Sequence, residues 1–175
     1  MIYSFFELKA RVPNVRLHIL GDTDDEEYRS ECVSLIEQLN VKDLALVGNV
    51  DVIKYMEQLD FTILTSISEA QPLSILESLA AGRPCIATDV GCCREIIEGT
   101  GLDRLGSAGI CTLPMHPQAI ASAMEFLCTR DKARLQMGQI GKKRISSHFT
   151  HGEMIKNYLD NYTEVFRKWP ASDLN

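Results

Sequence analysis

Short continuous apolar runs alternate along the chain with longer segments in which apolar residues recur every three or four positions. The short runs are typical of strands buried on both faces, and the longer spacing is typical of helices that bury one face. Their alternation predicts an α/β fold with a doubly wound parallel sheet of about five strands. The strands are predicted at residues 15–20, 44–47, 61–65, 85–88 and 109–113.

Helices are predicted between these strands and through the last third of the chain. Their ranges are 1–12, 26–40, 51–59, 72–81, 92–98, 117–128, 131–147 and 150–169. Several begin at a residue whose side chain can accept a hydrogen bond from the first turn. Asp24 or Asp25 fits this role for the second helix and Asp51 for the third, while Thr150 and Glu153 form a capping box for the last.

Apolar residues at helical spacing indicate which faces of these helices are buried. Three helices carry such sets: Val33, Ile36 and Leu39; Ile53, Met56 and Leu59; Ile120, Met124 and Leu127. The last helix carries a stripe, Met154, Tyr158, Tyr162 and Phe166. We expect the stripe to cover the sheet or its flanking helices, or to pack on a region that this chain does not contain.

The chain opens on a helix, whereas a doubly wound domain ordinarily begins with a strand. We therefore expect residues 1–175 to be one domain that is cut after its first strand and closes with a C-terminal helix in 150–175. A length of 175 residues and a hydrophobic fraction of 45% suit a single globular domain. No apolar run approaches the roughly 20 residues of a membrane span, and the start lacks the basic region of a signal peptide.

Charge and cysteine content narrow the function classes further. A net charge of −6 argues against nucleic acid as a partner. The six cysteines lack C-x-x-C spacing and several lie in apolar runs, which favours buried, reduced thiols in a cytoplasmic protein. The four histidines lack ligand spacing, so we expect no metal site.

Two carboxylates follow the third predicted strand. Pro72 fits the first position of a helix, and Gly82 ends that helix. Glu69 then lies on the loop above the strand. Glu77 lies about a turn and a half into the helix, at the margin of its apolar face, where we expect it to be partly shielded.

These residues can form an anion site at the carboxyl edge of the sheet. The backbone amides of Leu73 and Ser74 can face a phosphate. Glu77 can accept two hydroxyl hydrogen bonds, as ribose binding requires, and Glu69 can reach a hydroxylated group beyond the phosphates. The alternative is that both glutamates are ordinary surface residues.

The sequence from 66 to 97 does more than space two glutamates. It combines Glu-x7-Glu with Ala-Ala-Gly-Arg-Pro-Cys-Ile-Ala-Thr-Asp-Val-Gly and Cys-Arg-Glu-Ile-Ile. This combination resembles the retaining family 4 glycosyltransferases of the GT-B fold. It is most similar to the Pel-type exopolysaccharide branch, whose sequence motifs appear at residues 66–73 and 88–95. Residues 49–51 and 148–150 also match, so the resemblance covers nearly the whole chain.

The resemblance implies a role for each matching position in a Rossmann-like C-terminal domain. Glu77 matches the glutamate that binds the ribose hydroxyls, and Glu69 matches the catalytic-site glutamate that contacts the donor sugar. Leu73 and Ser74 fall where backbone amides meet the diphosphate.

The loops after the first two predicted strands match as well. Gly48, Asn49 and Val50 fall where the family borders the base, and Gly21 matches a glycine that lines the donor cleft. Thr23 stands where the family usually has a second glycine. The Arg/Lys pair that neutralises the donor phosphates, and the acceptor-binding N-terminal domain, have no counterpart in this chain.

The implied function is donor binding in a transferase that moves a hexosyl group, from UDP-glucose, to a glycan acceptor in bacterial exopolysaccharide biosynthesis. We expect no cofactor, an acceptor held by the N-terminal domain, and peripheral membrane or complex association of the full enzyme as one option. The fragment is expected to be inactive and to self-associate. Alternatives are a GT-B epimerase or glucan synthase fragment, or a flavodoxin-like module with Asp22 as phospho-acceptor.

Overall fold

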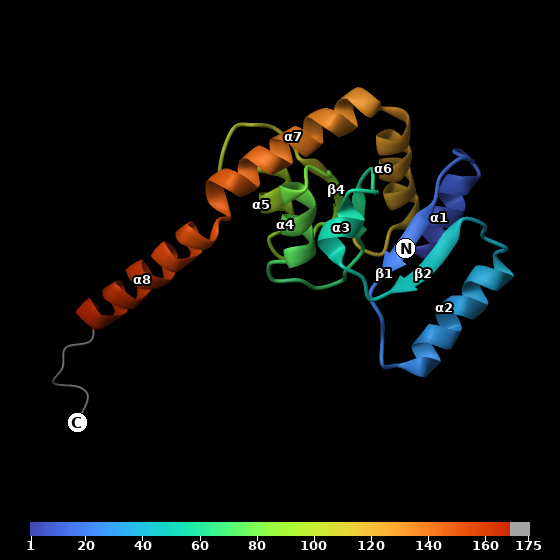
Figure 1. The fold of residues 1–175 in the computed structure, drawn as a ribbon, viewed down its shortest axis with the longest axis horizontal. Coiled ribbons are helices and arrows are strands. Elements are labelled where there is room, and N and C mark those ends of the chain that lie inside the picture. The colour runs from blue at the N-terminus through green and yellow to red at the C-terminus, as the bar shows by residue number, and fades with distance from the viewer. Residues whose placement is uncertain (169–175) are drawn as a thin grey trace.

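Five strands and eight helices alternate along residues 1–168, which are the residues that the computed structural model describes (Figure 1). The strands are β1 (Leu17–Leu20), β2 (Leu44–Gly48), β3 (Thr62–Leu64), β4 (Cys85–Thr88) and β5 (Gly109–Thr112). The helices are α1 (Ile2–Lys9), α2 (Glu26–Gln38), α3 (Val52–Met56), α4 (Leu73–Ala80), α5 (Cys93–Glu98), α6 (Pro117–Thr129), α7 (Asp131–His148) and α8 (His151–Lys168). The predicted order of elements is confirmed, and the predicted end of the last helix, at 169, lies outside the described residues.

The strands form two parallel sheets instead of the single sheet that we predicted. β1 pairs with β2, and β4 lies between β3 and β5. The facing edges, β1 and β3, share no ladder, and a cavity of about 890 Å³ lies between them. Adjacent strands form hydrogen bonds only at a spacing of about 4.8 Å. The cavity keeps β1 and β3 farther apart than this, so the two strands do not pair.

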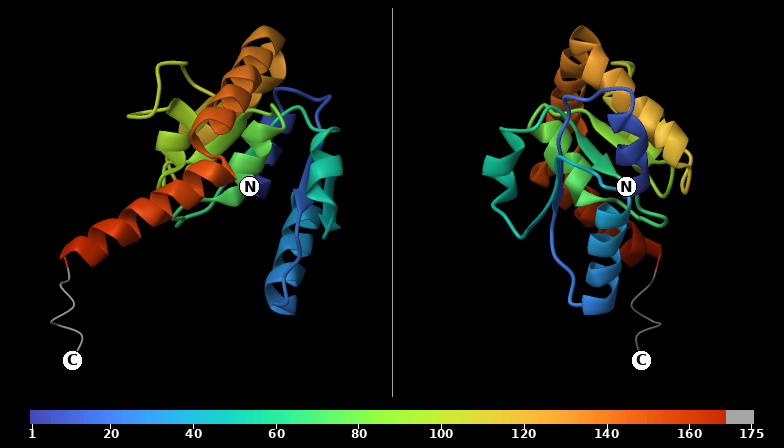
Figure 2. Two further views of the ribbon diagram at one scale, coloured as in Figure 1. Left: turned by 60° about the vertical axis from the view of Figure 1, so that its left-hand side comes forward. Right: turned by 90° about the vertical axis from the view of Figure 1, so that its right-hand side faces the viewer.

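β4 is buried on both faces and connects two cores. Cys85 and Ala87 pack in the core formed with α4, α5 and α7. Ile86, between them, packs in the core formed with α1 and α6. Figure 2 shows helices on both sides of this sheet. The alternation is that of a central parallel strand covered on both faces.

The predicted helix caps are confirmed. Asp25 accepts a hydrogen bond of 2.9 Å from the backbone N–H three residues later, and Asp51 accepts a similar bond of 3.4 Å. Thr150 accepts one of 3.2 Å from the N–H of Glu153. Each side chain satisfies one of the N–H groups that a first turn leaves unpaired.

The predicted buried faces hold for α6 and fail in part for α2 and α3. Ile120, Met124 and Leu127 are buried. Val33 is 39% exposed and Ile53 is 82% exposed, so both were wrongly assigned to buried faces. α3 has only five residues, little more than one turn, so it cannot bury a face of the predicted length.

The cysteines are free thiols, two of them in the interior. Cys85 and Cys93 are buried, and the other four are half-buried. Burial raises the pKa of the Cys85 thiol to about 12. A thiol with such a pKa stays protonated at neutral pH and is a poor nucleophile.

α8 projects away from the rest of the molecule (Figures 1 and 2). Every described residue of α8 is exposed, and its apolar stripe faces solvent, with Tyr158 57% and Phe166 72% exposed. The prediction that the stripe covers the sheet or its flanking helices is wrong, because Phe149 leaves helical geometry after α7 and redirects the chain. Packing on a region outside this chain stays a prediction. Within residues 1–168, no helix has the length and apolar content to cross a bilayer.

Candidate nucleotide-binding site

The carboxyl ends of β1, β2 and β3 meet near the start of α4. β1 is followed by β2 on one side of the cavity, whereas β3 is followed by β4 and β5 on the other, so the strand order reverses across it. Open α/β sheets bind ligands in the crevice at such a reversal. The cavity is lined at this end by five of the predicted site residues, Gly21, Asn49, Val50, Ser74 and Glu77. The fold therefore brings these residues together from the loops after β1 and β2 and from helix α4.

The start of α4 supplies unpaired backbone donors. The helix begins at Leu73, and Pro72 stands at the cap with φ −73° and ψ 119°, one residue earlier than the helical position that we predicted for it. Pro72 has no side-chain acceptor, so no cap hydrogen bond from a side chain reaches the first turn. The exposed N–H groups and the positive end of the helix dipole favour an anion here.

Glu77 differs from prediction in its burial. Glu77 is exposed, although its position lines the cavity. The buried face of α4 consists of Ile75, Ser78 and Leu79, which turns Glu77 toward the open crevice. Glu69, on the β3–α4 loop, is the half-buried one of the pair, and it is not among the residues that line the cavity.

The loop that carries Glu69 is clamped by the segment after β4. The backbone N–H and the thiol of Cys92 both donate to the carbonyl oxygen of Ala70, at 3.1 and 2.9 Å. Gly91 has φ +53°, and a Cβ at this position would lie 2.2 Å from the carbonyl oxygen of Glu69. The contact requires glycine, so Gly91 helps to set the position of Glu69. Gly91 belongs to the Thr-Asp-Val-Gly motif, but the sequence alone suggested no role for this glycine.

Two glycines turn the chain at the ends of β1 and β2. Gly21 has φ +103° and Gly48 has φ +78°, conformations that favour glycine. The N–H of Gly21 donates to the carbonyl oxygen of Gly48 at 2.8 Å, which ties the two loops together. Gly21 lines the cavity, whereas Gly48 and Leu73 are not among its lining residues.

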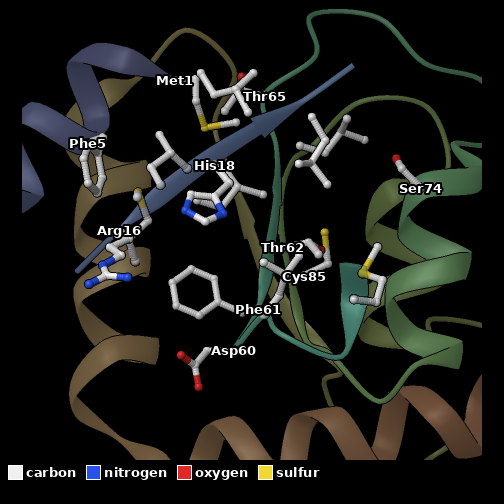
Figure 3. A pocket seen from close by; sticks show the side chains of 18 of the residues that line it. Met1, Phe5, Arg16, His18, Asp60, Phe61, Thr62, Thr65, Ser74 and Cys85 are labelled. Atoms are coloured by element: carbon white, nitrogen blue, oxygen red, sulfur yellow. The ribbon is translucent and has the colours of Figure 1, made fainter. Parts of the chain in front are cut away.

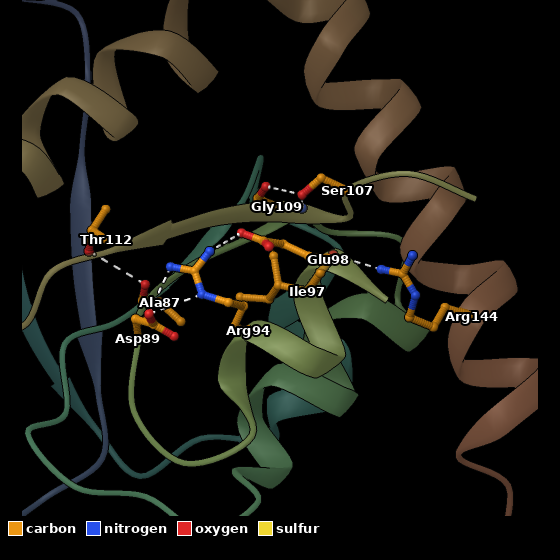
Figure 4. Close-up of polar contacts among 9 residues, drawn as sticks. All are labelled: Ala87, Asp89, Arg94, Ile97, Glu98, Ser107, Gly109, Thr112 and Arg144. Carbon is orange, nitrogen blue, oxygen red and sulfur yellow. Dashed lines mark hydrogen bonds and ion pairs between the residues drawn. The ribbon is translucent and has the colours of Figure 1, made fainter. Parts of the chain in front are cut away.

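The arginines closest to this site do not lie at the start of α4. Arg94 pairs with Asp89 at 2.7 Å and with Glu98 at 2.6 Å (Figure 4). Arg16 lines the cavity from the amino end of β1, on the side opposite Ser74 (Figure 3). Neither guanidinium stands at the start of α4. Backbone amides are therefore the positive groups that this part of the site offers.

His18 is a cavity residue that sequence reasoning missed. Its ring lies in the cavity (Figure 3), and its Nδ1 shares a hydrogen bond of 2.7 Å with the hydroxyl of Tyr55. We considered histidines only for metal-ligand spacing. The available signal was its place in the first predicted strand, where successive side chains point to opposite faces.

Comparison with known proteins now identifies the family. The family model "Glycosyl transferases group 1" matches residues 1–144, and the chain belongs to this family. N-acetyl-alpha-D-glucosaminyl L-malate synthase of Bacillus anthracis is 26% identical over 169 residues. That match covers 95% of this chain but only 42% of the relative. The chain thus spans less than half of the length of this relative.

Solved structures show the same fold. Anabaena Alr3699/HepE, determined in complex with UDP, superposes with a TM-score of 0.80 at 18% identity, over 93% of this chain and 44% of the other. The C-terminal domain of LpcC, a group 1 family protein of Francisella tularensis, gives a TM-score of 0.73 at 21% identity, over 86% and 77%. The Rossmann-like α/β fold of a GT-B C-terminal domain is thereby confirmed.

Proposed function

We propose that this chain is the donor-binding domain of a retaining family 4 glycosyltransferase of the Pel-type branch. The observation that carries the proposal is the start of α4. Its uncapped amides stand beside Ser74 and Glu77 at the reversal of strand order. Amide donors for a diphosphate and a carboxylate for ribose hydroxyls are the groups that a nucleoside diphosphate sugar requires.

Each residue has a role in this proposal. The amides of Leu73 and Ser74 hold the diphosphate, and Glu77 accepts hydrogen bonds from the ribose. Glu69, held on its clamped loop, contacts the donor sugar. Such fixed donors at the departing diphosphate stabilise the charge that develops there during transfer.

The base lies against the loops that follow β1 and β2. Gly21 leaves the cavity wall without a side chain, and Gly48, Asn49 and Val50 form the neighbouring loop. The site would work with UDP-glucose as substrate and without a metal or other cofactor. Neutralisation of the diphosphate would be completed by an Arg/Lys pair from outside this chain.

For the whole protein we propose hexosyl transfer to a glycan acceptor in bacterial exopolysaccharide synthesis, in the cytoplasm. The acceptor would be held by an N-terminal domain, with residues 1–175 as one truncated donor domain. This proposed activity concerns a protein longer than the present chain, which covers 42% of the Bacillus anthracis relative.

Calorimetric titration of the full-length protein with UDP, GDP and FMN tests the donor assignment. We expect UDP to bind, GDP to bind more weakly, and FMN to give no heat. Preferential binding of FMN would contradict the proposal and favour a flavodoxin-like module. Preferential GDP binding would reject the uridine assignment alone.

Substitution of the two glutamates tests their roles. Because Glu77 is exposed, Glu77→Gln should weaken UDP binding by about fivefold, or about 1 kcal/mol, which is the low end for losing a charged acceptor. Glu69→Gln should leave UDP binding unchanged and weaken UDP-glucose. Glu31→Gln, on α2 away from the cavity, is the matched control. Equal effects of both site variants on UDP would show that the roles are wrongly assigned.

A further inference from the structure

The loop between β3 and α4 is held from outside. Residues 66–71 lie on it, and their hydrogen bonds within the described part of the chain all go to the end of β4 or to the turn that follows it. At the start of the loop, the hydroxyl of Thr88 donates to the carbonyl oxygen of Ser66. Thr88 is 1% exposed, so water does not compete for this hydrogen bond. The loop therefore takes its position from β4 and the turn after it, and not from bonds of its own.

Cys92 holds the other end of the loop. Its backbone N–H and its thiol reach the same carbonyl oxygen, that of Ala70, at 3.1 and 2.9 Å. Glu69 immediately precedes Ala70. Among residues 1–168, the side chain of Glu69 finds no hydrogen-bond or ion-pair partner. The direction of the Glu69 carboxylate therefore depends on the backbone of the loop, and Cys92 fixes that backbone one residue away.

The thiol of Cys92 is suited to act as a donor. Burial, and after it the negative charges of Glu95 and Glu69, raise the pKa of the Cys92 thiol. The thiol therefore stays protonated at neutral pH and keeps the S–H group that donates. Cys92 stands at the cap of α5, but its side chain accepts no hydrogen bond from that helix. The thiol thus serves the loop and not the helix.

The turn that carries Cys92 is itself fixed. The N–H of Asp89 donates to the carbonyl oxygen of Thr112 at 2.8 Å. The carboxylate of Asp89 pairs with Arg94 at 2.7 Å (Figure 4). Cys93, the next residue after Cys92, is 0% exposed. Because the turn is anchored to β5 and to α5, a hydrogen bond from it can set the position of the loop.

Helix α4 does not depend on this hydrogen bond. Its residues Ile75 and Leu79 are both 0% exposed and pack in the core with α5 and α7. The amides and the carboxylate that we assigned to the nucleotide lie on this helix. Loss of the hydrogen bond from the thiol should therefore move Glu69 and leave the groups of α4 in place.

We propose that Cys92 is a positioning residue for transfer, whose thiol sets the place of Glu69 through the carbonyl of Ala70. It acts on the step that involves the donor sugar, and not on the binding of the nucleotide. This rests on the proposed role of Glu69 at the donor sugar, but the hold of Cys92 on the loop can be measured without any donor.

The first measurement uses the 175-residue chain without ligand. Cys92→Ala removes the S–H donor and keeps the backbone N–H, whereas Cys92→Ser supplies a hydroxyl, which also donates. Cys32→Ala, at a half-buried thiol on α2, is the matched control. NMR relaxation gives the backbone order parameters of Glu69 and Ala70. We expect these to fall from about 0.85 to about 0.6 in Cys92→Ala, and to stay near 0.85 in Cys92→Ser and in the control.

The second measurement uses the full-length protein and separates binding from turnover. In Cys92→Ala, kcat with UDP-glucose should fall about tenfold. This is less than the roughly 100-fold that a displacement of about 1 Å can cost, because the backbone hydrogen bond remains. The Kd for UDP should stay within about twofold, as expected when the lost interaction matters only in transfer. Cys92→Ser should recover most of kcat.

The proposal is overturned if Cys92→Ala leaves either the loop order or kcat unchanged. It is also overturned if Cys92→Ser behaves like Cys92→Ala, or if UDP binding falls in step with kcat. A full-length protein that neither binds UDP nor turns over UDP-glucose contradicts the proposed function instead. The order parameters then decide by themselves whether Cys92 holds the loop.

Discussion

Arg144 carries its charge in the interior of the molecule, where it is 0% exposed. Its guanidinium makes two hydrogen bonds of 2.8 Å to the carboxylate of Asp103. It also donates to the carbonyl oxygen of Ile97 at 2.6 Å, as Figure 4 shows. It thereby fastens α7 to α5 and to the loop before β5. The hydrogen bond from Arg144 holds the pKa of Asp103 down to about 2.

This pair gives the stability of the protein a defined dependence on pH. The unfolded carboxyl titrates near pH 3.9, so its stabilising contribution is complete above about pH 4 and is lost as the pH falls toward 2. We expect urea unfolding of the unmodified chain to show this loss, and Asp103→Asn to remove that part of the slope. At pH 7 the substitution should cost about 3 kcal/mol, because it leaves a buried cation without its counter-charge.

Asp89→Asn is the matched control. Asp89 pairs with Arg94, whose side chain is 46% exposed, so its loss should cost no more than about 1 kcal/mol. The assignment fails if Asp103→Asn keeps the full acid slope, or if both variants lose the same stability at pH 7.

The close contact of Gly91 with Glu69 predicts the effect of a substitution at Gly91. In Gly91→Ala the new methyl group would meet the carbonyl of Glu69, so the β3–α4 loop must move. We expect a loss of about 1–3 kcal/mol in denaturant unfolding, with weaker UDP-glucose binding. Gly101→Ala is the control, because Gly101 also has a positive φ of +78° but has nothing within 4 Å. Equal losses in the two variants would show that backbone strain alone matters and that the clamp does not.

Among the elements, α8 presents the largest continuous set of exposed apolar side chains. The rings of Tyr158 and Tyr162 stack on each other, with centroids 6.5 Å apart, and both face solvent. Exposed apolar patches of this kind promote association. We expect the chain to form concentration-dependent oligomers in sedimentation velocity experiments, and Tyr158→Lys with Tyr162→Lys to shift the distribution to monomer. Tyr28→Lys on α2 is the control, because Tyr28 is 58% exposed, and it should leave the distribution of oligomers unchanged. An equal shift in this control would show that α8 has no special role in association.

Local signals determined most of what the sequence could predict at this scale. Apolar runs found the five strands, and the capping residues Asp25, Asp51 and Thr150 marked helix starts correctly, because both signals act within a few residues. The failures depend on tertiary structure. The exposure of Ile53 follows from the shortness of α3, and the separation of β1 from β3 cannot be seen in any single segment.

In the candidate site, too, features with local sequence signals could be predicted, and features that depend on tertiary structure could not. The start of α4 and the glycines after β1 and β2 could be located, because helix starts and positive-φ turns leave local marks in sequence. The exposure of Glu77 depends on which face of α4 packs inward. The contact of Gly91 with Glu69 joins residues 22 positions apart, and only the fold brings them together.

At the scale of the whole molecule, binding and transfer should be separable. Transfer requires donor and acceptor to be held together in one geometry, and we have assigned the acceptor to a domain outside residues 1–175. We expect the 175-residue chain to bind UDP and to release none from UDP-glucose in the presence of glycan acceptors, as measured by chromatography. The full-length protein is the positive control. Steady turnover by the 175-residue chain would contradict this division.

The cavity of about 890 Å³ between β1 and β3 has a consequence for the volume of the protein. Unfolding under pressure is driven by the elimination of internal voids, and the volume change scales with the void that disappears. Any part of the cavity that water leaves empty makes the folded chain larger than its unfolded form. The 175-residue chain should therefore denature at lower hydrostatic pressure than the variant Ile63→Phe, whose larger side chain fills part of the cavity, even at temperatures where both are fully folded at atmospheric pressure.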